Sequence, residues 1–231
     1  MTQPNTDVDL LATTRAALHA VAEHVLAAAR YQATGRIGLA VSPGGFTTAP
    51  FGDPAREVAV DGDDLVVRTG VDDEVQVVRA PLRTLRDAAE HAGIAPGGPA
   101  EVYSLSTPCE PDAPLAIDSD TAQRLADWYA LGDEALQAWR REIAADDPSG
   151  STLWPEHLDV AIRAAGVNYG ASPGDEYVPV PYLYVGPPLP PPPAADGFWN
   201  VSFGAYRTWD EIQSVTDAVD FFRAGRDHAL S

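Results

Sequence analysis

The stretch Glu-Val-Ala-Val-Asp-Gly-Asp-Asp-Leu-Val-Val-Arg-Thr, residues 57–69, indicates the fold class of this chain. Two runs rich in β-branched residues, Glu57 to Val60 and Leu65 to Thr69, flank the tetrapeptide Asp-Gly-Asp-Asp that begins at Asp61. A turn of this composition between two such runs is a strong signal for a hairpin. The sequence therefore predicts antiparallel sheet at this place.

Short strands are expected through the rest of the chain as well. Each candidate is a run of roughly four to eight residues with β-branched or aromatic side chains, bounded by turn-forming residues. In chain order, these further strands are expected at residues 36–41, 46–49, 75–79, 102–105, 158–164, 180–185 and 199–206. A glycine-rich turn at residues 42–45 separates the first two.

Four helices are expected to cover the sheet. Apolar side chains that recur at spacings of three and four, ended by glycine or begun by a capping residue, are typical of such helices. They are expected at residues 7–31, ended by Gly35; from Pro81 to Gly93; at residues 120–145, capped by Asp118-Ser119-Asp120; and from the cap Thr208 to Arg226. The predicted fold class is α+β, with an antiparallel sheet covered by helices in one compact unit.

The elements repeat in two halves, each of which runs helix, strands, helix. We divide the chain into an N-terminal half (1–93), a connection (94–117) and an aromatic-rich C-terminal half (118–231). An offset of 121 residues lays residues 37–41 on residues 158–162 without gaps. An internal duplication explains this likeness, and so does the general self-similarity of α+β proteins. The sequence leaves both explanations open.

Charge and cysteine content limit the classes of partner. The chain has 231 residues, with 34 acidic against 15 basic side chains, and its formal net charge is −19. Such a charge repels phosphate backbones and anionic lipid, so we expect no binding to nucleic acid or to membranes. No secretion signal and no apolar run of membrane-spanning length is present, which indicates a cytoplasmic protein. The single cysteine, Cys109, excludes an intramolecular disulfide.

One group of residues is a candidate site. No phosphate-binding loop, dinucleotide fingerprint, nucleophile elbow or metal-ligand spacing is present, so no cofactor and no metal is predicted. A strand is expected over residues 158–164. If its alternation extends back by one residue, His157 and Asp159 share the face opposite Val160. A carboxylate beside a histidine raises its pKa and fixes its tautomer. Asp175 follows in an expected irregular loop.

Aromatic side chains are dense around these polar residues, which suggests an aromatic-walled pocket. The candidate pocket residues are His157, Asp159, Asp175, Tyr169, Tyr182 and Tyr184. The alternative is an aromatic core with a solvated His–Asp pair on the open side of a sheet. We expect a non-catalytic protein that binds an unknown small molecule or protein. The alternative function is a hydrolase or isomerase that uses His157, Asp159 and Asp175, with or without a divalent ion.

Residues 187–193 form a proline-rich segment of the polyproline II type. Such a segment either docks into a proline-binding partner or serves as a stiff connector. We favour a connector, because strands are expected on both sides of it.

Three motifs of the C-terminal half resemble a group of uncharacterised actinobacterial proteins. They are Trp154-Pro155-Glu156-His157-x-Asp159, the stretch from Tyr169 to Asp175, and the stretch from Pro181 to Pro187. Residues 45–50 are similar to the N-terminal half of the same group. The resemblance implies a GC-rich actinobacterial source, which agrees with the absence of lysine. It implies no catalytic residues.

Overall fold

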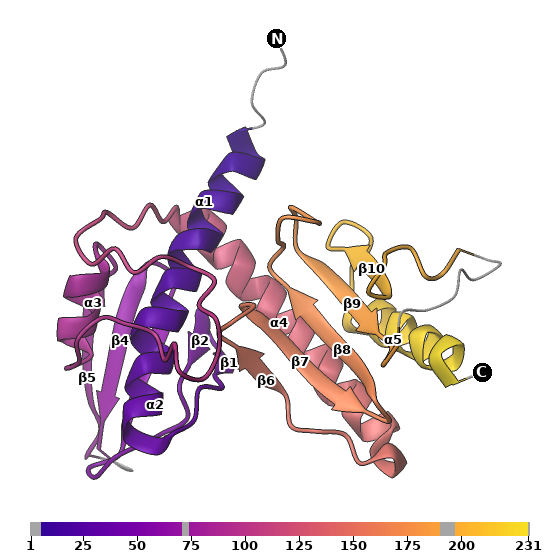
Figure 1. Cartoon of the computed structure of the whole chain (residues 1–231), viewed down its shortest axis with the longest axis horizontal. Coiled ribbons are helices and arrows are strands. Elements are labelled where there is room, and N and C mark those ends of the chain that lie inside the picture. Colours follow the sequence, from indigo (N-terminus) through magenta and orange to yellow (C-terminus); the bar gives the residue numbers. More distant parts are fainter. Residues whose placement is uncertain (1–5, 71–73, 190–196, 231) are drawn as a thin grey trace. The chain divides into compact units, whose positions relative to one another are not determined.

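The computed structural model describes residues 6–70, 74–189 and 197–230, and it has an α+β fold with two five-stranded antiparallel sheets (Figure 1). The predicted fold class is confirmed. The elements are α1 (Thr6–Val21), the π-helical segment η1 (Ala22–Ala27), α2 (Ala28–Thr34), β1 (Ala40–Ser42), β2 (Gly45–Thr47), β3 (Arg56–Asp61), β4 (Asp64–Thr69), β5 (Gln76–Pro81), α3 (Leu85–His91), α4 (Ser119–Glu142), the 3-10 turn η3 (Ala144–Asp146), β6 (Thr152–Trp154), β7 (Asp159–Ala164), β8 (Val167–Ser172), β9 (Tyr182–Gly186), β10 (Ala205–Thr208) and α5 (Val215–Leu230).

The chain divides into two compact units, whereas one compact unit was expected. The first unit comprises Met1–Asp127 with Leu153–Leu158, and the second comprises Trp128–Thr152 with Asp159–Ser231. The expected connection 94–117 therefore belongs to the first unit. None of the helices in the described residues is both long and apolar enough to cross a membrane.

The first helix of the first unit contains a π-helical turn. The predicted helix over residues 7–31 is confirmed, and it ends at Gly35, which adopts a left-handed backbone with φ 70°. Within it, every residue of η1 is buried, including Glu23 and His24. A π turn holds more residues than an α turn and is frequent at functional positions. This turn therefore places two neighbouring polar side chains inside the unit.

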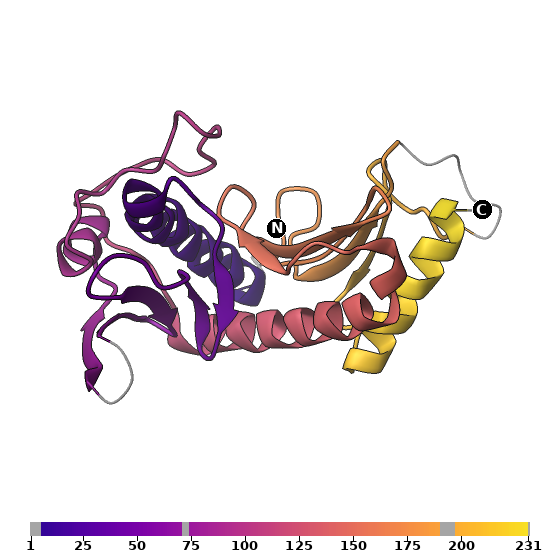
Figure 2. The ribbon, with the colours of Figure 1, turned by 90° about the horizontal axis from the view of Figure 1, so that it is seen from below.

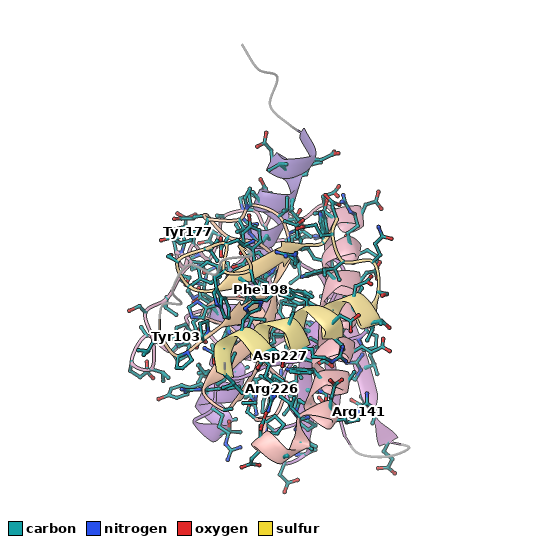
Figure 3. All side chains as sticks on the ribbon, turned by 90° about the vertical axis from the view of Figure 1, so that its right-hand side faces the viewer. Tyr103, Arg141, Tyr177, Phe198, Arg226 and Asp227 are labelled. Carbon is teal, nitrogen blue, oxygen red and sulfur yellow. The ribbon has the colours of Figure 1, made fainter. Side chains whose placement is uncertain are left out.

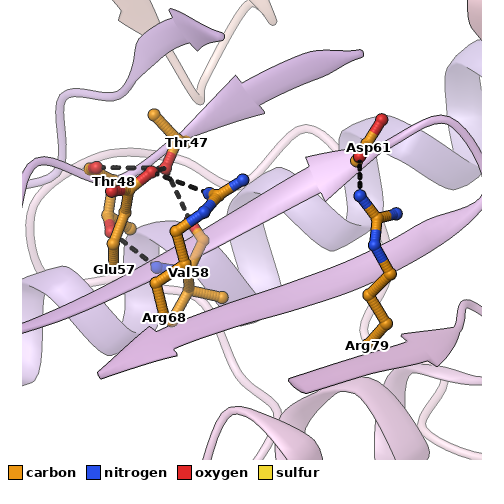
Figure 4. Close-up of polar contacts among 7 residues, drawn as sticks. All are labelled: Thr47, Thr48, Glu57, Val58, Asp61, Arg68 and Arg79. Atoms are coloured by element: carbon orange, nitrogen blue, oxygen red, sulfur yellow. Dashed lines mark hydrogen bonds and ion pairs between the residues drawn. The ribbon is translucent and has the colours of Figure 1, made fainter. Parts of the chain in front are cut away.

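The first sheet has the strand order β1-β2-β3-β4-β5, in which each strand pairs with the next. The predicted hairpin is confirmed, because Asp61 lies opposite Asp64 and Gly62 has φ 64°. Charged side chains on this sheet pair across strands (Figure 4). Arg68 of β4 pairs with Glu57 of the neighbouring β3, and Arg79 of β5 pairs with Asp61 at the end of β3. These pairs are partly exposed, so each contributes little to stability.

One prediction for the N-terminal half and one for the connection are wrong. Pro81 does not begin a helix, because it is the last residue of β5 and lies opposite Asp64. The helix α3 begins at Leu85, where the Thr84 side chain caps it by accepting a hydrogen bond from the Asp87 amide. Residues 102–105 form no strand and lie in turns and bends. Thr84 sets the start of the helix, because its hydroxyl accepts a hydrogen bond from the Asp87 amide in the first turn. Pro81 lies three residues earlier and has no side-chain acceptor for this amide.

The second sheet has the order β10-β9-β8-β7-β6, again with neighbours in sequence side by side. The helix α4 begins as predicted, because Asp118 accepts hydrogen bonds from the amide and the hydroxyl of Thr121. The irregular loop expected from residue 168 onward is wrong in its first part, which is strand β8. Thr208 does not cap the last helix. Ser214 does so by accepting from the Asp217 amide, and Thr208 closes β10.

Both helices of the second unit pack on one face of its sheet (Figure 2). Glycines allow this close approach. A Cβ on Gly132 of α4 would lie 2.5 Å from the Ala171 side chain, and a Cβ on Gly225 of α5 would lie 2.6 Å from Val185. The buried residues Val160, Ala171 and Val185 line this face, so it forms the core of the unit.

The internal duplication is not confirmed. Both sheets have five strands, and both follow chain order. The offset of 121 residues, however, lays β1 on β7, which is the first strand of one sheet on the second strand of the other. The residue-level alignment and the strand order therefore disagree. Most of the proline-rich segment 187–193 lies outside the described residues.

Candidate functional site

His157 does not lie on the strand where the sequence placed it. It occupies a turn at residues 155–158, its side chain is exposed, and Leu158 after it has a left-handed backbone with φ 54°. The strand β7 begins only at Asp159. His157 belongs to the first unit, whereas Asp159 belongs to the second. The expected pairing of the two residues on one strand face is therefore wrong.

Asp159 is buried at the start of β7, where it meets a tyrosine. Its exposed fraction is 7%, and it accepts a hydrogen bond from the hydroxyl of Tyr184 on β9. Tyr184 reaches this position across Gly170 of β8, where a Cβ would lie 2.4 Å from the tyrosine ring. A glycine at position 170 is therefore what lets the ring lie flat on the sheet.

Asp175 organises the loop between β8 and β9, which we call the Tyr177 loop (residues 173–181). One oxygen of its carboxylate accepts hydrogen bonds from the amides of Tyr177 (2.7 Å) and Val178 (2.8 Å). The other oxygen accepts from the hydroxyl of Tyr182 at 2.6 Å. The Asp175 amide donates to the Val178 carbonyl at 2.8 Å. This aspartate thus folds the loop around itself, as aspartate commonly does in turns.

Tyr169 belongs to the core and not to the candidate pocket. Its side chain is 1% exposed. Its ring meets Trp139 of α4 edge to face at 5.6 Å and Phe222 of α5 at 5.8 Å. Burial raises the pKa of the Tyr169 hydroxyl to about 12. The sequence grouped Tyr169 with Tyr182 and Tyr184. Tyr169 lies opposite Val185 of β9, which is one position from Tyr184, so its side chain points to the other face of the sheet.

Tyrosines line the face of the second sheet that is opposite α4 and α5. Tyr182 and Tyr184 lie on β9 with ring centres 6.2 Å apart, and Tyr206 of β10 lies 5.8 Å from Tyr182. We call these three residues and the two aspartates the tyrosine face. The structure therefore brings together four of the six predicted residues, namely Asp159, Asp175, Tyr182 and Tyr184.

The hydroxyls of Tyr182 and Tyr184 stay protonated at neutral pH. Burial raises the pKa of Tyr182 and Tyr184 above the usual value, and the neighbouring carboxylates of Asp175 and Asp159 raise it further. Each phenol therefore donates a hydrogen bond to a carboxylate. The arrangement suits the fixing of surface shape better than acid–base catalysis.

A second polar cluster, which the sequence did not single out, lies in the first unit. Glu23 and His24 are both 0% exposed. Glu23 accepts from the amides of Ser106 (3.0 Å) and Thr107 (2.8 Å) and from the Thr107 hydroxyl (2.5 Å). His24 accepts from the Gly98 amide at 2.9 Å through Nδ1, which leaves its Nε2 to donate to the Thr107 carbonyl at 3.1 Å.

These contacts hold the segment from residue 98 to residue 107 against the π turn. We call Glu23 and His24 the π-turn clamp. The only sequence signal for it is that two polar residues interrupt the apolar stripe between Val21 and Val25. Their partners lie 74 to 84 positions away in the chain, so no local pattern points to them.

The described residues hold no group of three or more histidine, cysteine, aspartate or glutamate side chains arranged to bind a metal ion. Cys109 is exposed, and partial burial raises the pKa of its thiol. Comparison of the chain with models of protein families, with curated proteins and with solved structures gave no match in any of the three. The geometry of the two units is therefore the basis for a functional proposal.

Proposed function

We propose that this chain is a non-catalytic recognition protein and that it binds a protein partner through the Tyr177 loop. The observation that carries the proposal is the exposure of Tyr177, which is 85%, on a loop that is held firmly in place. An aromatic side chain left in water gains free energy when a partner covers it. Tyrosine is among the residue types that contribute most to binding at protein interfaces.

The loop is organised before any partner arrives. Asp175 accepts hydrogen bonds from two amides of the loop. At the start of the loop, the Ser172 hydroxyl accepts from the Gly174 amide at 3.1 Å. At its end, the Pro181 carbonyl accepts from the Trp209 amide at 2.9 Å. A loop fixed in this way loses little conformational entropy on binding. The exposed Tyr177 ring can therefore contribute to the affinity for a partner without a large entropic cost.

Charge indicates the kind of partner. Glu176 beside Tyr177 is exposed, and the whole chain carries −19. Association is faster between surfaces of opposite charge, and like charges slow it. We expect a partner with a basic surface around an apolar depression that accepts the Tyr177 ring.

A photo-crosslinking residue at position 177 tests the proposal in the cells that make the protein. We expect a defined protein to be captured from position 177 and not from position 102, where Val102 is 47% exposed in the first unit. With the captured protein purified, Tyr177→Ala should weaken the affinity by tenfold or more, about 1.4 kcal/mol. Val102→Ala should leave it unchanged. If Tyr177→Ala binds as tightly as the native chain, the proposal is wrong.

A further inference from the structure

An open hollow at the C-terminal end of α4 is lined by two arginines. Its volume is about 470 Å³, and its walls are Gln137, Arg140, Arg141, Ala144 and Pro148. All five residues belong to the second unit. Figure 3 shows Arg141 beside α4, away from Tyr177. The hollow is therefore separate from the surface proposed above to bind a protein.

One residue orients both guanidinium groups. The side-chain oxygen of Gln137 accepts a hydrogen bond from a terminal nitrogen of Arg140 at 2.9 Å. The backbone oxygen of the same residue accepts from Nε of Arg141 at 3.1 Å. Gln137 is itself within reach of Asp133 (3.5 Å), which accepts from the Ser151 hydroxyl at 2.6 Å. The two cations are thus placed by a chain of polar contacts.

Neither cation is neutralised by a carboxylate in the part of the chain that the structure describes. Six other arginines form ion pairs there: Arg68, Arg79, Arg86, Arg207, Arg223 and Arg226. Two nearby acids are engaged elsewhere, since Glu142 pairs with Arg223 and Asp146 with Arg226. Asp147, next to Pro148 in the chain, forms no ion pair with either arginine in the described residues. Arg140 and Arg141 are neighbours in the chain and line the same hollow, so two positive charges lie together there.

An unsatisfied donor points to what is missing. The Nε atom of Arg140 is buried and has no hydrogen-bond acceptor among the described residues. Buried donors nearly always have an acceptor, because leaving one unpaired costs free energy. Arginine in the last turn of a helix also interacts favourably with the helix dipole. The dipole explains why α4 ends with two arginines, but it explains neither the buried Nε nor the hollow.

We propose that this hollow binds the oxyanion group of a small molecule, a carboxylate or a phosphate. Arg140 donates through a terminal nitrogen, and through the buried Nε once its side chain turns toward the ligand. Arg141 supplies the second charge. Guanidinium groups match the spacing of oxygens in both anions and form short, charge-assisted hydrogen bonds with them. Gln137 acts as a positioning residue, and Ala144 and Pro148 provide an apolar wall for the remainder of the ligand. The inference does not rest on recognition by the Tyr177 loop.

Titration of the full chain with three anions tests the site. Inorganic phosphate, sulfate and succinate are each added at constant ionic strength, with chloride as the balancing anion, and binding is followed by calorimetry and by the melting temperature. We expect saturable binding of at least one anion and a matching rise in melting temperature. Arg140→Gln should weaken it about tenfold or more, because it removes charge-assisted hydrogen bonds. Arg141→Gln should weaken it in the same direction.

Arg163→Gln is the matched control, since Arg163 is an exposed arginine of the same unit that does not line the hollow. It should bind as the native chain does. Preference for phosphate or for succinate identifies the class of ligand, and either preference supports the site. The proposal is overturned if no anion binds saturably at tens of millimolar, or if Arg163→Gln weakens binding as much as Arg140→Gln. If Arg140→Gln does not fold, Arg140→Lys and Arg141→Gln decide the outcome.

Discussion

The π-turn clamp of the first unit and the Tyr177 loop of the second are both built on a carboxylate held by amides and a hydroxyl. Glu23 is completely buried and accepts hydrogen bonds from two amides and a hydroxyl. Asp175 is half-buried and also accepts from two amides and a hydroxyl. The chemistry is the same, but the first carboxylate closes an interior and the second shapes a surface. We therefore expect the buried carboxylate to matter for stability, and the half-buried one for the shape of the surface that we propose as a binding site.

The largest effect that tests this contrast is expected from Glu23→Ala. The change leaves three part-buried donors without their acceptor and empties a side-chain position that is completely buried. Together these losses should lower the free energy of unfolding by roughly 3–5 kcal/mol. Chemical denaturation measures the loss. Glu101→Ala removes an exposed carboxylate of the same unit and should change stability by less than about 0.5 kcal/mol. Equal stability of the two variants would show that the clamp does not support the fold.

Gly170→Ala should have the next largest effect, because it places a methyl group where the Tyr184 ring lies. Overpacking of this kind costs about 1–3 kcal/mol. Gly150→Ala is the control, since nothing lies within 4 Å of its Cβ position, and it should be neutral. In a Tyr184→Ala background the Gly170→Ala change should cost nothing, because the ring that it meets is absent. A cost that persists in that background would remove Tyr184 as the cause.

These residues also show what the sequence reveals and what it does not. The hairpin around Gly62 was predictable, because its turn and both strands are neighbours in the chain. Strand β8 was missed, because the Gly-Ala-Ser-Pro-Gly stretch from Gly170 resembles a loop. Its glycine serves instead to admit a tyrosine from the next strand. Contacts between distant residues decide such cases, and the spacing of residues along the chain does not record them.

The candidate site was predictable in the same uneven way. Asp159 and Tyr184 were chosen for their aromatic and acidic surroundings, and the structure joins them by a hydrogen bond. His157 was placed with them because alternation was extended one residue too far. The left-handed backbone of Leu158 breaks that alternation, and a left-handed conformation at leucine is not foreseeable from the sequence. The π-turn clamp was missed, because its histidine seemed unremarkable within a helix.

An alkaline titration distinguishes the tyrosine face from an ordinary solvated surface. The pKa of Tyr184 is raised in the folded chain above its usual 10.0 by burial and by Asp159. The protonated phenol is therefore favoured by folding. Its contribution is fully present below pH 10 and is lost as the pH rises toward the folded pKa. We expect the free energy of unfolding to fall above pH 10, and to fall less steeply in Tyr184→Phe. Parallel curves for the two proteins would contradict a buried, carboxylate-bound phenol.

The smallest effect on stability is expected from Tyr177→Ala. A negligible effect would distinguish Tyr177 most clearly from the residues that support the fold. Tyr177 is 85% exposed, and the loop is held by its backbone amide and not by its ring, so truncation should change the free energy of unfolding by less than about 0.5 kcal/mol. Asp175→Ala in the same loop removes the acceptor of three hydrogen bonds and should cost about 1–3 kcal/mol. Hydrogen exchange should show faster exchange of the Val178 amide in Asp175→Ala and no change in Tyr177→Ala. A side chain that adds nothing to the fold yet stands on an ordered loop is one whose contribution lies in binding. A large loss of stability in Tyr177→Ala would instead assign the ring to the fold and remove the reason to look for its partner.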